Sequence, residues 1–209
     1  MQKYDVLIIG AGPAGIFTAL EILKLGSDKK ILIAEKGRAI ENRSCPKSKT
    51  KACVSCKPYC HITTGFSGAG AFSDGKLSLS YEVGGDLPSL IGENFAQETI
   101  DYTDKIYLEF GADEHIEGIS NSEEVKKIRK RAIQAGLKLV DCPIRHLGTE
   151  KAQKIYYDLE QYLLDNGVDI MYGTYIVATD VQDGKIKHIY IAHGRQSHIH
   201  CRHTACRFI

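Results

Sequence analysis

The first 35 residues constrain the fold of this chain more than any other segment. Residues 4–9 form a short apolar run rich in β-branched side chains, which is typical of a buried parallel strand. A turn of six residues follows, Gly10-Ala-Gly-Pro-Ala-Gly15, and apolar residues then recur at helical spacing. Residues 30–34 are a second buried strand that ends at Glu35. We therefore predict a βαβ unit and an α/β fold class with a Rossmann-like core.

The glycines of this turn have the spacing that a dinucleotide needs. Gly10 allows the sharp turn, Gly12 lets the backbone approach a pyrophosphate, and Gly15 lets the helix pack closely on the strand. Free N–H groups at the start of the helix attract phosphate. A carboxylate at Glu35 accepts hydrogen bonds from ribose hydroxyls and repels a 2′-phosphate, which disfavours NADP. The residues of this unit expected to bind the cofactor are Gly10, Gly12, Pro13, Ala14, Gly15, Glu35 and Lys36.

The rest of the chain divides by its pattern into further regions. Residues 37–90 lack helical and strand periodicity, and a segment this long without structure is usually functional or an insertion. We expect residues 1–90 to form the dinucleotide-binding, Rossmann-like core with this loop, and residues 91–145 to form an inserted, mainly helical region. Residues 146–192 return to the core, and residues 193–209 are an atypical tail rich in histidine and cysteine.

Regular elements are also expected within the later regions. Helical patterns cover residues 94–110, 122–135 and 149–166, and the basic run in the second of these is expected to be a solvated face. Residues 168–172 have the pattern of a strand. The two apolar runs on either side of Asp183-Gly184 predict a β-hairpin, since this residue pair favours a tight turn.

Composition excludes several classes of partner. The formal net charge is +1 over 209 residues, which favours neither nucleic acid nor an anionic membrane as a partner. The longest apolar runs, such as residues 6–9 and 31–34, are too short to span a bilayer. No signal-peptide pattern follows Met1, so we expect a cytoplasmic protein.

Four of the seven cysteines lie close together in the irregular segment. The spacing Cys45-x7-Cys53-x2-Cys56-x3-Cys60 could supply four thiolates, or three with His61, to zinc or to an iron–sulfur cluster. A redox-active dithiol is the second interpretation, because a C-x-x-C pair can exchange electrons with a flavin. The third is a set of reduced cysteines in a loop. The sequence leaves all three open.

A second glycine-rich segment follows the cysteines. In residues 65–77, Gly68, Gly70 and Gly75 permit close backbone approach to a flat ligand such as a flavin ring. Ser73 and Lys76 could add a hydroxyl group and a positive charge, which would tune the cofactor. A plain hairpin around Asp74-Gly75 is the alternative.

Several of these motifs together resemble a known family. They are Gly65-Phe-Ser-Gly-Ala-Gly-Ala-Phe-Ser-Asp-Gly-Lys-Leu77, the preceding cysteines, Phe110-Gly-Ala112 and Arg145-His-Leu-Gly-Thr149. They are similar to motifs of uncharacterised bacterial FAD-dependent dehydrogenases, which are flavoproteins of the two-dinucleotide type. The resemblance covers residues 1–192, as the N-terminal part. It implies an FAD cofactor, a Rossmann-like core with an inserted second domain, and a redox reaction on an undefined substrate.

The resemblance also makes the end of the chain unusual. It implies an apolar strand and a segment that closes over the flavin, and residues 193–209 supply neither. We expect truncation or a change of reading frame near residue 193. The alternative is a zinc or copper site at the histidines and cysteine of this tail, His198, His200, Cys201 and His203.

Two residues are candidates for catalysis. His146 could act as a proton donor, since the pKa of histidine lies near neutrality, although a lone histidine is more often structural. Lys76 is the other candidate, and Arg145 could pair with an anionic substrate. We therefore expect an FAD-dependent oxidoreductase, or its N-terminal part, that transfers two electrons to or from an organic small molecule. The alternatives are a non-catalytic dinucleotide-binding module and a protein whose function is metal binding by cysteines.

Overall fold

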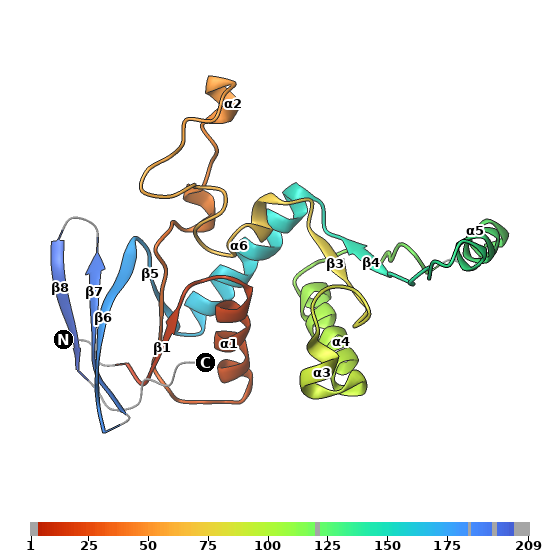
Figure 1. Cartoon of the computed structure of the whole chain (residues 1–209). Helices are drawn as coiled ribbons and strands as arrows, with labels where there is room; N and C mark the ends of the chain where they lie inside the picture. The colour runs from red at the N-terminus through yellow and green to blue at the C-terminus, as the bar shows by residue number, and fades with distance from the viewer. Residues whose placement is uncertain (1–3, 120–121, 184, 194–195, 203–209) are drawn as a thin grey trace. The chain divides into compact units, whose positions relative to one another are not determined.

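The computed structural model of the chain describes residues 4–119, 122–183, 185–193 and 196–202. Figure 1 shows the order of its helices and strands. The chain divides into two compact units. Unit 1 comprises Met1–Phe72 and Tyr156–Ile209, and unit 2 comprises Ser73–Ile155. Each unit is described by itself.

A parallel sheet with one covering helix forms the first half of unit 1. Strand β1 (Val6–Ile9) pairs in parallel with β2 (Ile31–Ala34), and β2 pairs in parallel with β5 (Asp169–Met171), so the strand order is β1-β2-β5. Helix α1 (Pro13–Lys24) lies beside β1 and buries its apolar face (Figure 1). The βαβ unit predicted from the periodicity is therefore present, with all four residues of β2 buried.

An antiparallel sheet forms the second half of unit 1. Its strands are β6 (Thr174–Gln182), β7 (Lys185–His193) and β8 (Gln196–Arg202), in the order β6-β7-β8. The predicted hairpin is present, since Gln182 pairs with Lys185, while Gly184 of its turn lies outside the described residues. Ile189 and Ile191 of β7 pack with buried residues of the parallel sheet, Leu7, Leu32 and Ala34. One apolar core therefore joins the two sheets.

The final strand differs from the expectation for the tail. Residues 196–202 pair along β7, although their sequence has no core pattern. The reason is physical: an edge strand is held by backbone hydrogen bonds, which a side-chain pattern does not report. The side chains of His198, His200 and Cys201 and all of His203 lie outside the described residues, so the zinc or copper site stays a prediction.

Short elements and turns occupy residues 35–72, the segment of unit 1 that follows β2. They are η1 (Ile40–Asn42), α2 (Lys47–Thr50) and η2 (Gly70–Phe72). This agrees with the predicted lack of periodicity. Helix α6 (Thr149–Asp165) begins in unit 2 and continues into unit 1, where Leu159 and Leu163 are fully buried.

The described part of unit 2 contains a two-stranded sheet, three complete helices and the start of α6. Strands β3 (Lys76–Ser78) and β4 (Ile144–His146) pair antiparallel, and the helices are α3 (Leu87–Ile91), α4 (Glu93–Glu109) and α5 (Glu123–Gln134). The helix α4 buries Ala96, Ile106 and Tyr107. Helices α4 and α5 lie within residues 91–145, and the predicted bounds of an inserted region stay a prediction.

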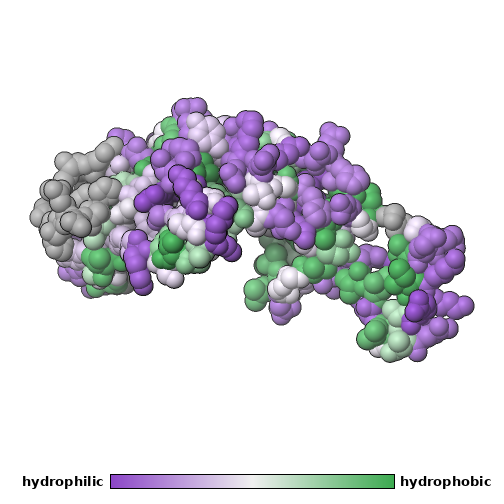
Figure 2. All heavy atoms as spheres, turned by 90° about the horizontal axis from the view of Figure 1, so that it is seen from above, coloured by the Kyte–Doolittle hydropathy of each residue, from purple (hydrophilic) through white to green (hydrophobic). Residues whose placement is uncertain are grey.

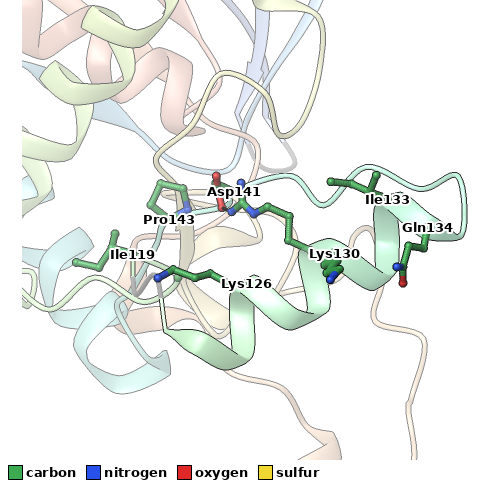
Figure 3. Close-up of a pocket in the computed structure, with 9 residues that line it drawn as sticks. Ile119, Lys126, Lys130, Ile133, Gln134, Asp141 and Pro143 are labelled. Carbon is green, nitrogen blue, oxygen red and sulfur yellow. Dashed lines mark hydrogen bonds and ion pairs between the residues drawn. The ribbon is translucent and has the colours of Figure 1, made fainter.

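Helix α5 is amphipathic and has no buried residue. Its basic side chains are largely solvated as expected, while Ile128 and Ile133 remain more than half exposed. Figure 2 shows hydrophobic residues beside hydrophilic ones around this helix, at the right of the view. An open cavity of about 780 Å³ lies between α5 and the chain that follows it, and Figure 3 shows Lys126, Ile133 and Asp141 at its wall.

The architecture is a mixed α/β fold. A three-stranded parallel sheet covered by α1 is the Rossmann-like part, and the described strands do not make up a full doubly wound sheet. Within the part of the chain that the structure describes, no helix is both long and apolar enough to cross a bilayer.

Candidate dinucleotide site

The site begins at the glycine turn between β1 and α1. Gly10 has a φ of +94°, a left-handed conformation that residues with a Cβ rarely adopt. Its backbone N–H donates to the carbonyl oxygen of Ala34 over 2.8 Å, which ties the end of β1 to the end of β2. The role predicted for Gly10, a sharp turn, follows from this conformation.

Gly15 brings helix α1 close to the strand. A Cβ atom at this position would lie 2.1 Å from the carbonyl oxygen of Gly10 and 3.1 Å from a methyl group of Ile8. A separation of 2.1 Å between heavy atoms is a severe overlap, and the nearer atom belongs to the backbone. Close packing of α1 therefore requires glycine here.

Replacing Gly15 with alanine is expected to destabilise the fold. Since the backbone of Gly10 must move, the free energy of unfolding should fall by about 1–3 kcal/mol, the usual cost of overpacking. Denaturant unfolding followed by circular dichroism measures this change. An unfolding midpoint equal to that of the wild type would show that α1 does not pack as described.

Gly12 has a different character from the other two glycines. Its φ is −76°, which any residue adopts, and a Cβ built on it would meet no atom of another described residue within 4 Å, its chain neighbours aside. It is the N-cap of α1, no side chain caps this helix end, and Pro13 and Ala14 after it are exposed. Neither the backbone conformation nor the packing of the chain itself explains a glycine at this position.

The Glu35 carboxylate is buried and connects two loops. One oxygen accepts a hydrogen bond from the N–H of Ala11 over 2.8 Å, and the other accepts one from the N–H of Gly37 over 2.7 Å. A carboxylate can accept about four hydrogen bonds, so acceptor capacity remains for a ribose hydroxyl. Ribose binding by Glu35 stays a prediction. The structural role in holding the turn is one that sequence reasoning missed.

Arg43 is a further residue that the sequence did not single out. Its side chain is buried, and the guanidinium donates to three carbonyl oxygens: His61 over 2.9 Å, Gly68 over 2.6 Å, and Phe66. The guanidinium also lies over the ring of Phe72, 4.7 Å from its centroid. Burial lowers the pKa of Arg43, and the negative charge of nearby Glu35 opposes this shift.

Arg43 thereby organises the glycine-rich loop beside the turn. Ser67 lies between Phe66 and Gly68, two of the residues whose carbonyl groups Arg43 binds. It donates its backbone N–H to the carbonyl oxygen of Ala11 over 2.7 Å. The loop is thus fixed both by a buried cation and by the turn itself. The sequence around Arg43 gives no signal for this role, since its neighbours Asn42 and Ser44 are polar and carbonyl acceptors leave no trace in a side-chain pattern.

A second buried polar pair lies near this site. Glu160 is almost fully buried and accepts hydrogen bonds from the Tyr172 hydroxyl and, over 3.3 Å, from the N–H of Ile40. Burial raises the pKa of Glu160, while these hydrogen bonds act in the opposite direction. Burial and the charge of Glu160 together raise the pKa of Tyr172.

This pair predicts a dependence of stability on pH. Because the folded state raises the pKa of Glu160 above its ordinary value of 4.5, the folded state favours the protonated carboxyl group. The resulting stabilisation is fully present below pH 4.5 and is lost as the pH rises through the raised pKa. Relative to Glu160→Gln, the wild type should lose stability over this range in chemical unfolding. A difference that is independent of pH, or that changes in the opposite direction, would contradict this account.

A cavity of about 480 Å³ adjoins the Glu35 end of the site. Gly37, Arg38, Tyr59, Tyr172 and Gly173 are among the residues that line it. Its volume is within the range of small-molecule pockets, about 300–1,000 Å³. Gly37, which donates its N–H to the Glu35 carboxylate, is one of these lining residues. A ligand in this cavity would therefore lie close to a ligand bound at the glycine turn.

The glycine-rich motif of residues 65–77 is divided between the units. Gly68 and Gly70 belong to unit 1, where Gly68 has a φ of +61°. Ser73 and Lys76 belong to unit 2, and the Lys76 ammonium pairs with Asp74 over 2.8 Å. Contact of all four with one cofactor stays a prediction.

The catalytic candidates lie in the small sheet of unit 2. Lys76 and His146 are directly opposite one another in the β3–β4 ladder, and His146 Nε2 lies 3.2 Å from a carboxylate oxygen of Glu117. Both side chains are at least one third exposed, which fits surface ion pairs as well as proton transfer.

The structure corrects the expectation that Arg145 pairs with an anionic substrate. Its buried guanidinium binds both carboxylate oxygens of Asp104, over 2.6 and 2.7 Å, and also donates to the carbonyl oxygen of Asp113. Asp104 raises the pKa of Arg145. A guanidinium that is buried and already paired is not available to an anionic substrate, so its role is structural.

The metal prediction for the cysteines is not supported. Among the described residues, no group of three or more His, Cys, Asp or Glu side chains could hold a metal ion. Zinc and iron–sulfur sites need convergent ligands, and the spacing alone does not bring them together. The four cysteines expected as ligands, which are unpaired in this structure, are Cys45, Cys53, Cys56 and Cys60.

The fold of this chain is similar to that of known proteins, although its sequence is not. Neither a protein-family model nor a curated protein matches the sequence. Among solved structures, the chain is similar to a 3-ketosteroid-Δ4-(5α)-dehydrogenase from Rhodococcus jostii, with a TM-score of 0.55 and 13% identity over 96% of this chain and 44% of that chain. A likeness at this identity shows the fold alone, so the class that the fold defines is an α/β protein that shares the architecture of an oxidoreductase.

Two further structures are similar to a lower degree. They are a glycine oxidase from Bacillus cereus (TM-score 0.47, 15% identity, 96% of this chain and 55% of that chain) and an L-amino acid deaminase from Proteus vulgaris (0.49, 15%, 91% and 44%). Both TM-scores lie below 0.5, so no conclusion about this chain is drawn from these two structures. The chain spans about half the length of the three proteins.

Proposed function

We propose that this chain holds the ADP half of FAD and is the cofactor-binding part of an oxidoreductase. The pyrophosphate would lie against Gly12 and the N–H groups at the start of α1, where the helix dipole attracts negative charge. The ribose would bind Glu35. The bound flavin would supply two-electron redox chemistry, and the residues of this chain would bind and orient it.

One observation carries the proposal, namely the open space at Gly12. Gly10 is explained by its conformation and Gly15 by packing, whereas no contact with the described residues explains Gly12. A phosphate that approaches the backbone closely accounts for a glycine there, because a Cβ would occupy its place. The uncapped N-terminus of α1 supports the same ligand, since its free N–H groups need acceptors.

The choice of FAD has two supports besides the turn. The resemblance of residues 65–77 to FAD-dependent dehydrogenases favours a flavin, and the fold shared with a dehydrogenase is consistent with redox chemistry. The Glu35 carboxylate opposes a 2′-phosphate, so NADP is the least favoured dinucleotide.

Thermal unfolding with three dinucleotides tests the proposal. Ligand at 100 times its dissociation constant stabilises a protein by about 2.7 kcal/mol, which corresponds to a rise in Tm of roughly 5–10 °C for a chain of this size. We expect this rise with FAD, a smaller one with NAD and none with NADP. An equal rise with NADP would contradict the assigned role of Glu35, and no rise with any of them would contradict the proposed function.

A further inference from the structure

The four clustered cysteines of unit 1 line one small cavity. Its volume is about 170 Å³, and the residues that line it include all four cysteines together with Lys47 and Lys57. The residues that bring the thiols to this wall are Cys45, Cys53, Cys56 and Cys60. Because these residues line one cavity, the cysteines that cluster in the sequence also surround one space in the structure.

The arrangement suits two sulfur atoms better than three or four. A structural metal needs several convergent donors, and the described residues supply no such group. A disulfide needs two cysteines whose Cα atoms come within about 7 Å of each other. This requirement concerns two residues only, and four cysteines that line one small cavity offer several such pairs, which makes pairwise thiol chemistry the favoured interpretation.

The cavity is also accessible to a small reagent. Cys53 and Cys60 are exposed, and the two lysines at the wall favour the approach of an anionic disulfide. The cluster adjoins the Arg43 network, because His61, next to Cys60, provides the carbonyl oxygen that the guanidinium binds over 2.9 Å. Thiol chemistry here would therefore occur beside the loop that packs on the glycine turn.

We propose that Cys60 and one cysteine of the Cys53-x2-Cys56 pair form a thiol–disulfide site that reacts with small disulfides. The Cys60 thiolate attacks one sulfur of the small disulfide, which forms a mixed disulfide and releases one thiolate. The thiolate of Cys53 or Cys56 then attacks the Cys60 sulfur, which forms an internal disulfide and releases the second thiolate. Two cysteines are oxidised, one disulfide is reduced, and the two protons pass to the released thiolates.

This proposal is independent of FAD, and mass spectrometry of the full chain tests it. The metal-free protein is treated with oxidised glutathione at neutral pH, and linked peptides are then identified. We expect a loss of two hydrogens, one disulfide that joins Cys60 to Cys53 or Cys56, and full reversal by reduced glutathione. Glutathione should attach to Cys60 at least about tenfold faster than to Cys142, a cysteine of unit 2.

Two variants separate this chemistry from general thiol oxidation. Cys60→Ser should abolish the internal disulfide, whereas Cys142→Ser, the matched control, should leave it unchanged. Peptide mapping of the wild type keeps the test decisive even if Cys60→Ser does not fold. A disulfide that leaves Cys60 free, or mixed disulfides that never convert to an internal one, would overturn the proposal. Protection of all four thiols by bound zinc would overturn it as well.

Discussion

Replacement of Gly12 by alanine is expected to lower the affinity for FAD at least about 100-fold, or about 2.7 kcal/mol, without a change in stability. A Cβ at this position meets no protein atom within 4 Å, so the fold has no reason to respond. The pyrophosphate, in contrast, would approach the backbone at this point and would meet the added methyl group. Titration of FAD, followed by quenching of flavin fluorescence, measures the affinity, and thermal unfolding measures stability.

The comparison with two other variants of α1 makes this prediction sharp. Gly15→Ala should lose stability, because its Cβ would overlap the Gly10 carbonyl. Thr18→Ala, one turn after Gly15 in α1, removes a methyl group and a hydroxyl group that donates to the Ala14 carbonyl, and it should bind FAD normally. If Gly12→Ala bound FAD as tightly as the wild type, the open space at this glycine would not be a phosphate site.

The second large effect is expected at Arg43. Arg43→Met removes the donor of three hydrogen bonds and leaves the carbonyl groups of His61, Phe66 and Gly68 without this partner. Hydrogen bonds to charged groups contribute roughly 1.5–3 kcal/mol each, so a loss of about 5 kcal/mol is expected. Since typical domains have a total stability of about 5–15 kcal/mol, this change would remove much of the stability of unit 1.

Matched variants test the reason for the effect at Arg43. Arg43→Lys keeps the charge but not the planar fork, so it should restore only part of the stability. Arg129→Met removes an arginine that pairs with Asp141 on the surface, and it should cost at most about 1 kcal/mol. Denaturant unfolding measures all three. An Arg43→Met protein as stable as the wild type would mean that the guanidinium does not hold the loop.

The parts of the fold that depend on side-chain periodicity could be predicted. The unit formed by β1, α1 and β2 follows from buried strands with continuous apolar residues and from the glycine spacing between them. Helix α4 and the β6–β7 hairpin have equally clear patterns. Strand β8 could not be predicted, because it is held to β7 through its backbone.

The roles of site residues could be predicted where one physical property of the residue type, such as the missing Cβ of glycine, determines its role. The turn conformation of Gly10 and the packing of Gly15 follow from the absence of a Cβ. The buried partners of Arg43 and Arg145 were not predictable, since carbonyl groups leave no pattern and a partner such as Asp104 lies far away in sequence. Cysteine spacing likewise predicted possible metal ligands but not whether their sulfur atoms converge.

Competition against bound FAD is the most direct test of the central claim, that the glycine turn holds the ADP half of this cofactor. The wild-type chain is titrated with FAD, ADP or FMN is then added as a competitor, and the FAD that remains bound to the protein is separated by gel filtration and quantified by chromatography. The account predicts one FAD per chain, displacement by ADP, and much weaker displacement by FMN, which lacks the adenosine moiety. Failure to bind FAD, or displacement by FMN as effective as that by ADP, would contradict it.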